Sequence, residues 1–267
     1  MQIIKEYVAE KKERLKKELS EQDPIKMVIV QIGHVPASDR YVRNKAKDAA
    51  EVGIDCEIDN LPEDIEEEEL LDMLDGLNKD DSVDGYLVQL PLPKHISEEK
   101  VKLAIAPEKD IDGFHPLSKT VPATPLGMIN YLEDQGYNFD GKNCVILGRS
   151  LIVGQPAHKL LLDRNMNVIM LHTHTSAEDK KFYIEHADLI ISAAGRRNIL
   201  DDSYNIKPDA VILDVGINFD ENGKLCGDCN YESLVNKVAF ISPTPGGVGL
   251  LTRIAVIENL IKLAENK

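Results

Sequence analysis

Apolar and charged positions alternate along the first part of the chain in patterns that predict helices and strands in turn. Residues 1–20 place isolated apolar side chains among charges at helical spacing. The β-branched run at 27–31 is typical of a short buried strand. We expect a helix over 39–52 to follow, capped at its start by Ser38 and ended by Gly53.

The next predicted elements are a very acidic helix over 63–78 and a strand over 85–90, which Pro91 prevents from continuing. From 106 to 141 the pattern loosens and is rich in proline and glycine, so we interpret it as a crossing between two lobes. One helix, over 125–135, is expected to follow this crossing.

Strand-like segments dominate the second half of the chain. They are Asn143–Leu147, Asn167–Leu171, Leu189–Ala193, Ala210–Val215 and Val238–Ile241. Helical patterns at 152–164 and 176–186 separate the first three, and this alternation predicts βαβ units in a mainly parallel, doubly wound sheet. The amphipathic segment 249–266 is expected to pack back on the first lobe. The predicted fold class is therefore α/β, with two lobes.

The overall charge narrows the range of partners. The 267 residues include 31 Lys and Arg against 46 Asp and Glu, a net charge of −15, and the isoelectric point is near 4.9. This excess of acid argues against a nucleic-acid partner and against adsorption on anionic lipid. No stretch approaches the roughly 20 apolar residues of a membrane span, so we expect no membrane partner. Four cysteines are too few for a disulfide scaffold, which favours a cytoplasmic location.

A glycine-rich turn joins the predicted strand 143–147 to the helix after it. Gly148 permits a tight turn and Gly154 a close approach of helix and strand, while the backbone N–H groups are aimed at a phosphate. Ser150 stands where the second glycine of the usual dinucleotide motif would be. A plain strand–helix connection is therefore the alternative, and the surrounding βαβ frame favours a dinucleotide.

The end of the next strand distinguishes between dinucleotides. NAD-binding folds usually place an acid there for the ribose 2′-hydroxyl, but residues 171–175 contain none. Thr173, His174 and the cation Arg149 are suited instead to a 2′-phosphate. The sequence therefore favours NADP over NAD as the cofactor.

Candidate acid–base groups lie in the first lobe. Tyr41 and Lys45 share one face of a predicted helix, and lysine becomes a proton-transfer group where an apolar pocket lowers its pKa. Gln89 lies at the carboxyl end of a predicted strand, where open α/β sheets bind ligands. Asp112 and a second acid stand in the loop 109–115, suited to an N–H-rich heterocycle. An ordinary surface pair at Tyr41 and Lys45, and turn-capping acids in the loop, are the alternatives.

Two further segments carry weaker chemical signals. Cys226 and Cys229 form one CxxC pair, but no second pair follows, so we predict no metal site and no thiol chemistry. The loop 243–249 is rich in proline and then in glycine, which suits close approach to a ligand or a cofactor.

Several motifs, taken in order, resemble the methylenetetrahydrofolate dehydrogenase/methenyltetrahydrofolate cyclohydrolase family. The matching segments are Pro36-Ala-Ser38 with Tyr41-Val and Lys45, Gly85-Tyr-Leu-Val-Gln-Leu-Pro-Leu-Pro93, Pro107-Glu-Lys-Asp-Ile-Asp-Gly-Phe-His115, Gly148-Arg-Ser-Leu-Ile-Val-Gly154, Asp214-Val-Gly-Ile217 and Pro245-Gly-Gly-Val-Gly249. Each motif alone is modest evidence for the resemblance, but the ordered set covers nearly the whole chain and is highly specific for this family.

The resemblance implies an enzyme that oxidises 5,10-methylenetetrahydrofolate with NADP⁺ to the methenyl cation and then hydrolyses that cation to 10-formyltetrahydrofolate. It implies that Lys45 is the central proton-transfer residue of the hydrolysis. Tyr41 would pack on the folate and orient Lys45, Gln89 would hydrogen-bond to Lys45 and tune it, and Asp112 would anchor the pterin ring.

The remaining predicted contacts also follow from the resemblance. The predicted cofactor contacts are Gly148, Arg149, Ser150, Gly154, Thr173, His174 and Ile217. The predicted substrate contacts are Tyr41, Gln89, Asp112, Pro245, Gly246 and Gly247. The resemblance further implies a homodimer active in one-carbon metabolism and purine biosynthesis.

The resemblance also divides the chain into two domains. Residues 1–118 with the C-terminal helix 250–267 would form a catalytic, folate-binding domain, and residues 119–249 a Rossmann-like NAD(P)-binding domain. Two other functions stay open from the sequence: an NAD(P)-dependent dehydrogenase of a small acid or amino acid, and a regulatory module that senses the dinucleotide ratio. Neither would need Tyr41, Lys45, Gln89 and Asp112 together.

Overall fold

The computed structural model describes residues 1–266, which form two compact units. One unit contains a three-stranded sheet and consists of residues 9–123 and the chain from Arg253 onwards. The other contains a five-stranded sheet and consists of residues 1–8 and 124–252. We call them the three-stranded unit and the five-stranded unit. Their limits fall a few residues beyond those expected from the sequence, and the first eight residues belong with the five-stranded unit.

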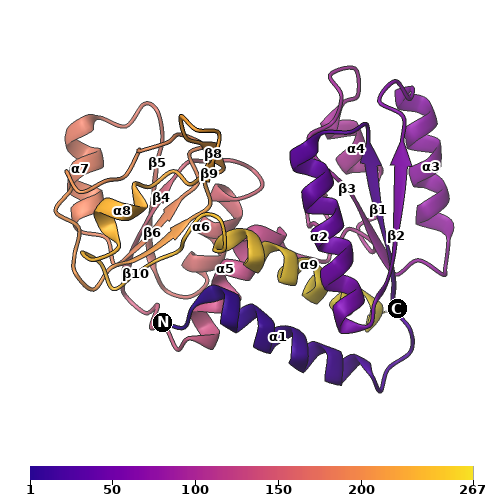
Figure 1. The fold of residues 1–267 in the computed structure, drawn as a ribbon, viewed down its shortest axis with the longest axis horizontal. Coiled ribbons are helices and arrows are strands. Elements are labelled where there is room, and N and C mark those ends of the chain that lie inside the picture. The colour runs from indigo at the N-terminus through magenta and orange to yellow at the C-terminus, as the bar shows by residue number, and fades with distance from the viewer. Residues whose placement is uncertain (267) are drawn as a thin grey trace. The chain divides into compact units, whose positions relative to one another are not determined.

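The three-stranded unit is a parallel α/β layer. Its strands are β1 (Lys26–Ile32), β2 (Asp55–Leu61) and β3 (Gly85–Val88), in the order β2-β1-β3. Its helices are α2 (Pro36–Val52), α3 (Glu67–Lys79) and α4 (Glu98–Ala104). Helices α2 and α3 lie on opposite sides of the strands (Figure 1). Leu70 and Leu74 of α3 belong to one buried cluster with Val28 and Val30 of β1.

The start of α2 corrects one expectation from the sequence. The helix begins at Pro36, three residues before its expected start at Asp39, and no side chain caps it. Ser38 is instead a buried residue inside the first turn. Proline suits a first helical turn because its fixed φ is already helical and its missing N–H would have no partner there. Gly53 ends the helix as predicted, with φ 95° in the left-handed region.

The five-stranded unit has an entirely parallel main sheet. Its strands are β4 (Asn143–Leu147), β5 (Asn167–Leu171), β6 (Leu189–Ser192), β7 (Val211–Asp214) and β10 (Phe240–Ile241), in the order β10-β7-β6-β4-β5. Its helices are α5 (Ala123–Asp134), α6 (Gly154–Leu162), α7 (Ala177–Glu185) and α8 (Tyr231–Leu234). An antiparallel pair, β8 (Asn218–Phe219) and β9 (Leu225–Cys226), forms a small hairpin.

Alternate side chains of β4 enter two separate cores in the five-stranded unit. Cys144 and Ile146 pack with residues of α5 and α6, whereas Val145 and Leu147 pack with residues of α7 and α8. Successive strand residues point to opposite faces, so both faces of the sheet are covered by helices. The expected α/β, doubly wound fold is confirmed.

The strand order indicates where a ligand crevice is expected in the five-stranded unit. The chain leaves β4 towards β5 on one side and returns to β6 on the other, so β4 and β6 are neighbours at the point where the order reverses. Open α/β sheets bind ligands at the carboxyl ends of the strands at such a point. The glycine-rich turn after β4 and the loop after β6 therefore lie where this crevice is expected.

The first and last helices contribute to both units. Helix α1 (Ile4–Leu19) is divided after Val8, and helix α9 (Val248–Ala264) after Thr252. The greater part of α9 belongs to the three-stranded unit, as expected for the C-terminal segment. Within residues 1–266 no helix is long and apolar enough to cross a membrane.

Candidate active site

A buried lysine and a nearly buried carboxylate face each other in the three-stranded unit. Lys45 lies on α2 with 8% of its side chain exposed, and Asp112 lies on the loop after α4 with 13% exposed. Lys45 Nζ and Asp112 Oδ1 are 3.8 Å apart. A charged pair with so little access to water interacts more strongly than an exposed one. Two of the predicted site residues, 67 positions apart in the chain, are therefore brought together.

The two acids of the 109–115 loop have different roles. Asp110 is 1% exposed and accepts hydrogen bonds from the N–H groups of Gly113 (2.9 Å) and His115 (2.8 Å). Its burial raises the pKa of its carboxyl, which the hydrogen bonds from the backbone oppose. Asp110 thus stabilises the turn, which was the alternative role considered for an acid in this loop. Asp112 is the acid that faces Lys45.

A side chain near the C-terminus fixes this loop from the other side. Asn259 of α9 is 2% exposed, and its Nδ2 donates to the carbonyl oxygens of Ile111 (2.9 Å) and Val121 (2.8 Å). Gly113 has φ 73°, and a Cβ there would lie 2.5 Å from the carbonyl carbon of Val121. The backbone on both sides of Asp112 is therefore tightly held.

Tyr41 lies one helical turn before Lys45 and is partly buried. Burial raises the pKa of its hydroxyl, and the nearby Arg253 of α9 opposes that rise. The shared face of Tyr41 and Lys45, expected from their spacing, is consistent with a helix at both positions. Tyr41 is thus a neutral aromatic group beside the buried lysine.

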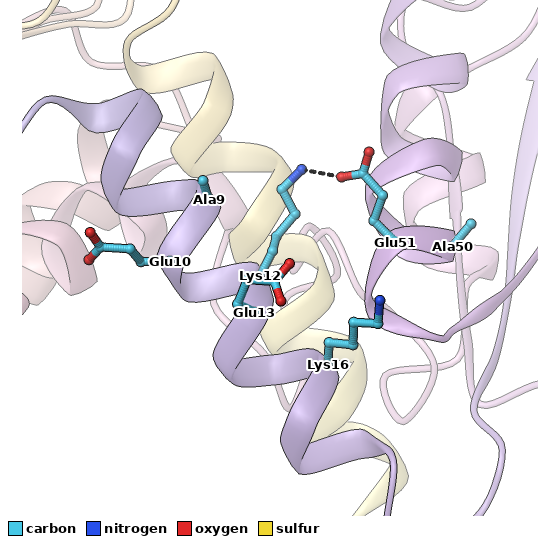
Figure 2. Close-up of a pocket in the computed structure, with 7 residues that line it drawn as sticks. All are labelled: Ala9, Glu10, Lys12, Glu13, Lys16, Ala50 and Glu51. Carbon is cyan, nitrogen blue, oxygen red and sulfur yellow. Dashed lines mark hydrogen bonds and ion pairs between the residues drawn. The ribbon is translucent and has the colours of Figure 1, made fainter.

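A second buried carboxylate on α2 organises the same helix. Asp48 accepts a hydrogen bond from Lys12 Nζ at 2.7 Å and forms an ion pair with Arg253 Nε at 2.9 Å, so α1, α2 and α9 meet at one carboxylate. A pocket opens beside this cluster, and Figure 2 shows Lys12 reaching across it to Glu51. The pocket is lined by Ala9, Glu10, Lys12, Glu13, Lys16, Ala50 and Glu51. None of the predicted site residues lines it, and its opposite charges partly satisfy one another.

Gln89 follows β3 at the carboxyl edge of the sheet. Its N–H donates to Val30 O at 2.8 Å, and its side-chain Nε2 donates to Leu90 O at 2.8 Å. Its Oε1 is buried and has no hydrogen-bond partner among the described residues. An unpaired buried acceptor calls for a partner that the protein itself does not supply. The expected hydrogen bond from Gln89 to Lys45 therefore stays a prediction.

The glycine turn of the five-stranded unit has the shape that a dinucleotide phosphate needs. Gly148 has φ 116°, and a Cβ there would lie 2.3 Å from Ala193 O. A Cβ on Gly154, the first residue of α6, would lie 2.5 Å from Gly148 O. Only glycine fits at both positions, which keeps the backbone close to the crevice and to the N-terminus of α6. The residues present therefore fit a bound dinucleotide.

Ser150 helps to begin helix α6. Its Oγ accepts from the N–H groups of Val153 (3.2 Å) and Gly154 (3.3 Å). This hydroxyl does the work of a capping residue although it lies before the helix proper. A contact between Ser150 and a cofactor stays a prediction.

The residues after β5 form an exposed tip without an acid. Thr173 and His174 are exposed, and Thr175 Oγ1 accepts from the N–H of His172 at 3.0 Å. Arg149, in the neighbouring glycine turn, is exposed as well. These groups are accessible to a phosphate, as the sequence predicted for the NADP-specific contact.

The remaining predicted contacts also lie in the five-stranded unit. Ile217 follows β7 and is 56% exposed. Pro245 and Gly246 are exposed, whereas Gly247 is buried and a Cβ there would lie 2.2 Å from Pro243 O. The loop before α9 is thus closely packed at one glycine and accessible at the residues before it.

The CxxC segment contains two free thiols and a buried carboxylate between them. Cys226 and Cys229 are free thiols, and no group of three or more His, Cys, Asp and Glu side chains is arranged for a metal within residues 1–266. Burial raises the pKa of Cys229. The residue between them, Asp228, is fully buried and accepts several backbone N–H groups.

Sequence reasoning missed Asp228, Asn259 and Asp48. Asn259 is a buried polar residue within the apolar pattern of the last helix. Asp48 is likewise a buried polar residue, on the inner face of α2. Asp228 follows a glycine in a short polar segment, with no comparable signal. A charged or amide side chain on the apolar face of a helix is buried only when it has partners, so that signal was available for the other two.

Family models match both parts of the chain. A tetrahydrofolate dehydrogenase/cyclohydrolase catalytic domain matches residues 1–112, and a tetrahydrofolate dehydrogenase/cyclohydrolase NAD(P)-binding domain matches residues 122–267. A bifunctional protein FolD from Streptococcus pneumoniae is 44% identical over 247 residues, covering 89% of this chain and 86% of that protein. A bifunctional protein FolD from Staphylococcus aureus is 45% identical over 249 residues, covering 90% of this chain and 86% of that protein.

Solved structures give the same similarity in three dimensions. The bifunctional FolD methylenetetrahydrofolate dehydrogenase/cyclohydrolase from Campylobacter jejuni has a TM-score of 0.93 at 39% identity, covering 99% of this chain and 98% of that one. The Trypanosoma brucei methylenetetrahydrofolate dehydrogenase-cyclohydrolase, complexed with NADP and an inhibitor, has a TM-score of 0.87 at 29% identity, covering 98% and 94%.

Proposed function

The chain belongs to the tetrahydrofolate dehydrogenase/cyclohydrolase family, and we propose how its own residues carry out that family's two reactions. The protein oxidises 5,10-methylenetetrahydrofolate to the 5,10-methenyl cation with NADP⁺ and hydrolyses the cation to 10-formyltetrahydrofolate. A dehydrogenase of a small acid or amino acid is not supported. We assign folate binding and hydrolysis to the three-stranded unit and dinucleotide binding to the five-stranded unit.

The glycine turn and the tip after β5 are proposed to hold NADP. Gly148 and Gly154 leave room for a phosphate at the start of α6, and Arg149, Thr173 and His174 are accessible to a 2′-phosphate. Ser150 and Ile217 keep their predicted contacts with the cofactor. When bound, the oxidised nicotinamide supplies an acceptor for hydride. The observation that supports NADP over NAD is the absence of an acid from residues 171–175.

The dehydrogenase reaction needs no nucleophile from the protein. A hydride leaves the one-carbon bridge of the substrate, and the resulting cation is stabilised by the two nitrogens that flank it. The protein therefore acts by positioning the folate. Tyr41 is proposed to pack on the folate rings and Asp112 to accept hydrogen bonds from the pterin. Pro245, Gly246 and Gly247 keep their predicted role as substrate contacts.

The hydrolysis is proposed to use Lys45 as the proton-transfer group. Water adds to the methenyl carbon while the neutral amine takes one of its protons, and that proton passes on to solvent. The second water proton ends on N5 of the folate as the bond from N5 to the one-carbon unit breaks. The neutral form of the amine is the one that can take a proton from water. Gln89 Oε1, which is buried and unpaired, is an available acceptor for the ammonium or for water.

The observation that carries this assignment is the enclosed contact between Lys45 and Asp112, 3.8 Å apart. An ordinary surface pair at Tyr41 and Lys45 would leave the amine in solvent, but Lys45 is 7% exposed. The distance of 3.8 Å between Lys45 Nζ and Asp112 Oδ1 is longer than a direct hydrogen bond, so the amine can still bind a substrate atom or a water molecule. This separates the catalytic interpretation from the surface-pair alternative.

One assay tests both reactions. Purified protein is mixed with 5,10-methylenetetrahydrofolate and NADP⁺ or NAD⁺, and the absorbance of methenyltetrahydrofolate is followed. Its decay when methenyltetrahydrofolate is supplied alone measures the hydrolysis. We expect both activities and a higher kcat/KM with NADP⁺. A clear preference for NAD⁺ contradicts the cofactor assignment, and no turnover with either dinucleotide contradicts the dehydrogenase assignment.

The sequence resemblance also supports a homodimer in the cytoplasm, and both stay proposals. Light scattering on the purified protein measures its mass directly. A mass of one chain at the concentration of the assay contradicts the dimer. Fractionation of cells that produce the protein tests its location.

A further inference from the structure

The loop after β6 curls around a carboxylate of the protein itself. The N–H groups of Ala194 (2.7 Å) and Gly195 (3.1 Å) donate to Asp228 Oδ2, and the N–H of Arg196 donates to Oδ1 (2.9 Å). Gly195 has φ 62°, which lets successive N–H groups converge. Converging backbone N–H groups of this kind usually form a concave site for an external anion. Here Asp228 occupies that site.

Asp228 has further partners on every side. It is 0% exposed, and Ser192 Oγ (3.3 Å) and Asn218 Nδ2 (2.8 Å) also donate to it. Five donors therefore reach the two oxygens of one carboxylate. Burial of an ionised carboxylate is unfavourable without such hydrogen bonds, so this number of donors is what the position requires.

A second aspartate seats Asp228. Asp214, the last residue of β7, accepts from the N–H of Asp228 at 2.9 Å and from the N–H of Cys229 at 2.8 Å. A rigid strand thus fixes Asp214, Asp214 fixes the backbone of Asp228, and the Asp228 carboxylate fixes the loop after β6.

Two glycines allow this close arrangement. A Cβ on Gly216 would lie 2.2 Å from Asp228 Oδ1, and a Cβ on Gly227 would lie 2.0 Å from Asp214 Oδ2. Any larger residue would displace a carboxylate, so the backbone at 216 and 227 is shaped around the two acids.

The loop held by Asp228 is a wall of the dinucleotide crevice. It follows β6, which is the neighbour of β4 where the strand order reverses. Its residue Ala193 has the carbonyl oxygen that a Cβ on Gly148 would approach to 2.3 Å. A shift of this loop would therefore alter the space beside the glycine turn.

We propose that Asp228, seated by Asp214, is a positioning residue for the NADP site, holding residues 193–196 against the glycine turn. The inference rests on the proposed dinucleotide-binding function of the five-stranded unit. Because Asp228 already occupies the N–H groups of 194–196, these groups do not bind the cofactor phosphates. The phosphates depend instead on the glycine turn and on side chains.

The test is Asp228→Asn in the full-length protein. An amide keeps the size of the side chain but places an NH₂ donor where only hydrogen-bond donors approach. We expect the NADPH dissociation constant, measured by fluorescence titration, and KM for NADP⁺ to rise about tenfold or more, because hydrogen bonds to a charged group are the strong ones. The hydrolysis of methenyltetrahydrofolate, which consumes no dinucleotide, should stay within about twofold of wild type.

Two further variants make the outcome decisive. Asn218→Ala removes one donor to Asp228 and should weaken NADPH binding less than Asp228→Asn does. Asp220→Asn alters a carboxylate that accepts the N–H groups of Asn222 and Lys224 at the tip of the β8–β9 hairpin, and should leave NADPH binding unchanged. Unchanged NADPH binding in both Asp228→Asn and Asn218→Ala overturns the proposal.

A general structural role has a different signature. If Asp228→Asn lowers hydrolysis as much as it weakens NADPH binding, or fails to fold while Asn218→Ala binds NADPH normally, Asp228 is not a specific positioning residue. If wild type binds NADPH but turns over no folate, the proposed function fails. The NADPH titration then still decides the role of Asp228.

Discussion

Lys45 Nζ lies 3.8 Å from Asp112 Oδ1, and both side chains are nearly buried. This separation exceeds the roughly 2.7–3.2 Å of a direct hydrogen bond. The carboxylate therefore balances the lysine charge without holding its protons in one direction. A substrate atom or a water molecule can approach the amine without first breaking a tight ion pair, as a proton-transfer group requires.

Replacement of this lysine should separate the two activities. Lys45→Met keeps a long apolar stem but removes the amine, so we expect hydrolysis of methenyltetrahydrofolate to fall by about 10²-fold or more. The measurement is the decay of methenyltetrahydrofolate absorbance. Lys47→Met is the matched control, because Lys47 is on the same helix with 72% of its side chain exposed. Hydrolysis near the wild-type rate in Lys45→Met would show that another group transfers the proton.

The two acids of one loop should respond differently to substitution. Asp112→Ala should raise KM for the folate in both reactions, because a charged acceptor for the pterin is lost, with little change in the melting temperature. Asp110→Asn should mainly lower the melting temperature, because Asp110 accepts the N–H groups of Gly113 and His115. Titration calorimetry with folate measures the first effect. Unchanged folate affinity in Asp112→Ala removes this residue from the site.

Asn259 should contribute strongly to stability. Asn259→Leu leaves the carbonyl oxygens of Ile111 and Val121 without their side-chain donor, each costing about 1–3 kcal/mol. We expect urea denaturation to show a loss of about 2–6 kcal/mol, together with a higher KM for folate as the Asp112 loop shifts. Asn266→Ala, which alters an exposed amide bonded to Lys262 O, is the control. Equal stability of the two variants would contradict the role of Asn259.

The five-stranded unit should lose stability in acid through Asp188. Burial disfavours its charge, but hydrogen bonds from Lys207 and from the N–H of Asn143 lower the pKa of its carboxyl below 3.8. A lowered native pKa gives stability that is present above the unfolded-state pKa and is lost as the pH falls through the native one. At about pH 6–7 the melting temperature of wild type should therefore exceed that of Asp188→Asn. This difference in melting temperature should shrink below about pH 4. A difference that is independent of pH would contradict this.

The strong β-branched runs were predictable from the sequence, and one strand was not. The strand at 143–147 was predicted at its observed limits because four of its five residues are apolar and buried. Strand β2 was missed because Asp55–Leu61 contains three acids and has largely intermediate or exposed positions at the edge of the sheet. Its position is decided by pairing with β1, a contact between distant residues that local pattern does not carry.

The candidate site divides in the same way. Lys45 and Asp112 were predictable as candidates, because their residue types and their places after strands or on a helix suit the chemistry. The backbone groups that Asn259 and Asp228 hold were not predictable, because these groups lie far away in the sequence. A carboxylate that accepts three N–H groups of another loop shows nothing of that in its own neighbours.

The hydrogen bonds from Asn259 to the Asp112 loop can form only late in synthesis of the chain. A ribosome releases the Lys45 helix and the Asp112 loop long before it releases residue 259, yet that residue supplies two of the side-chain hydrogen bonds to the loop. While the chain is still being made, the loop lacks this support. A protein shortened before α9 is therefore expected to have a loosely held lysine–aspartate pair and weaker hydrolysis.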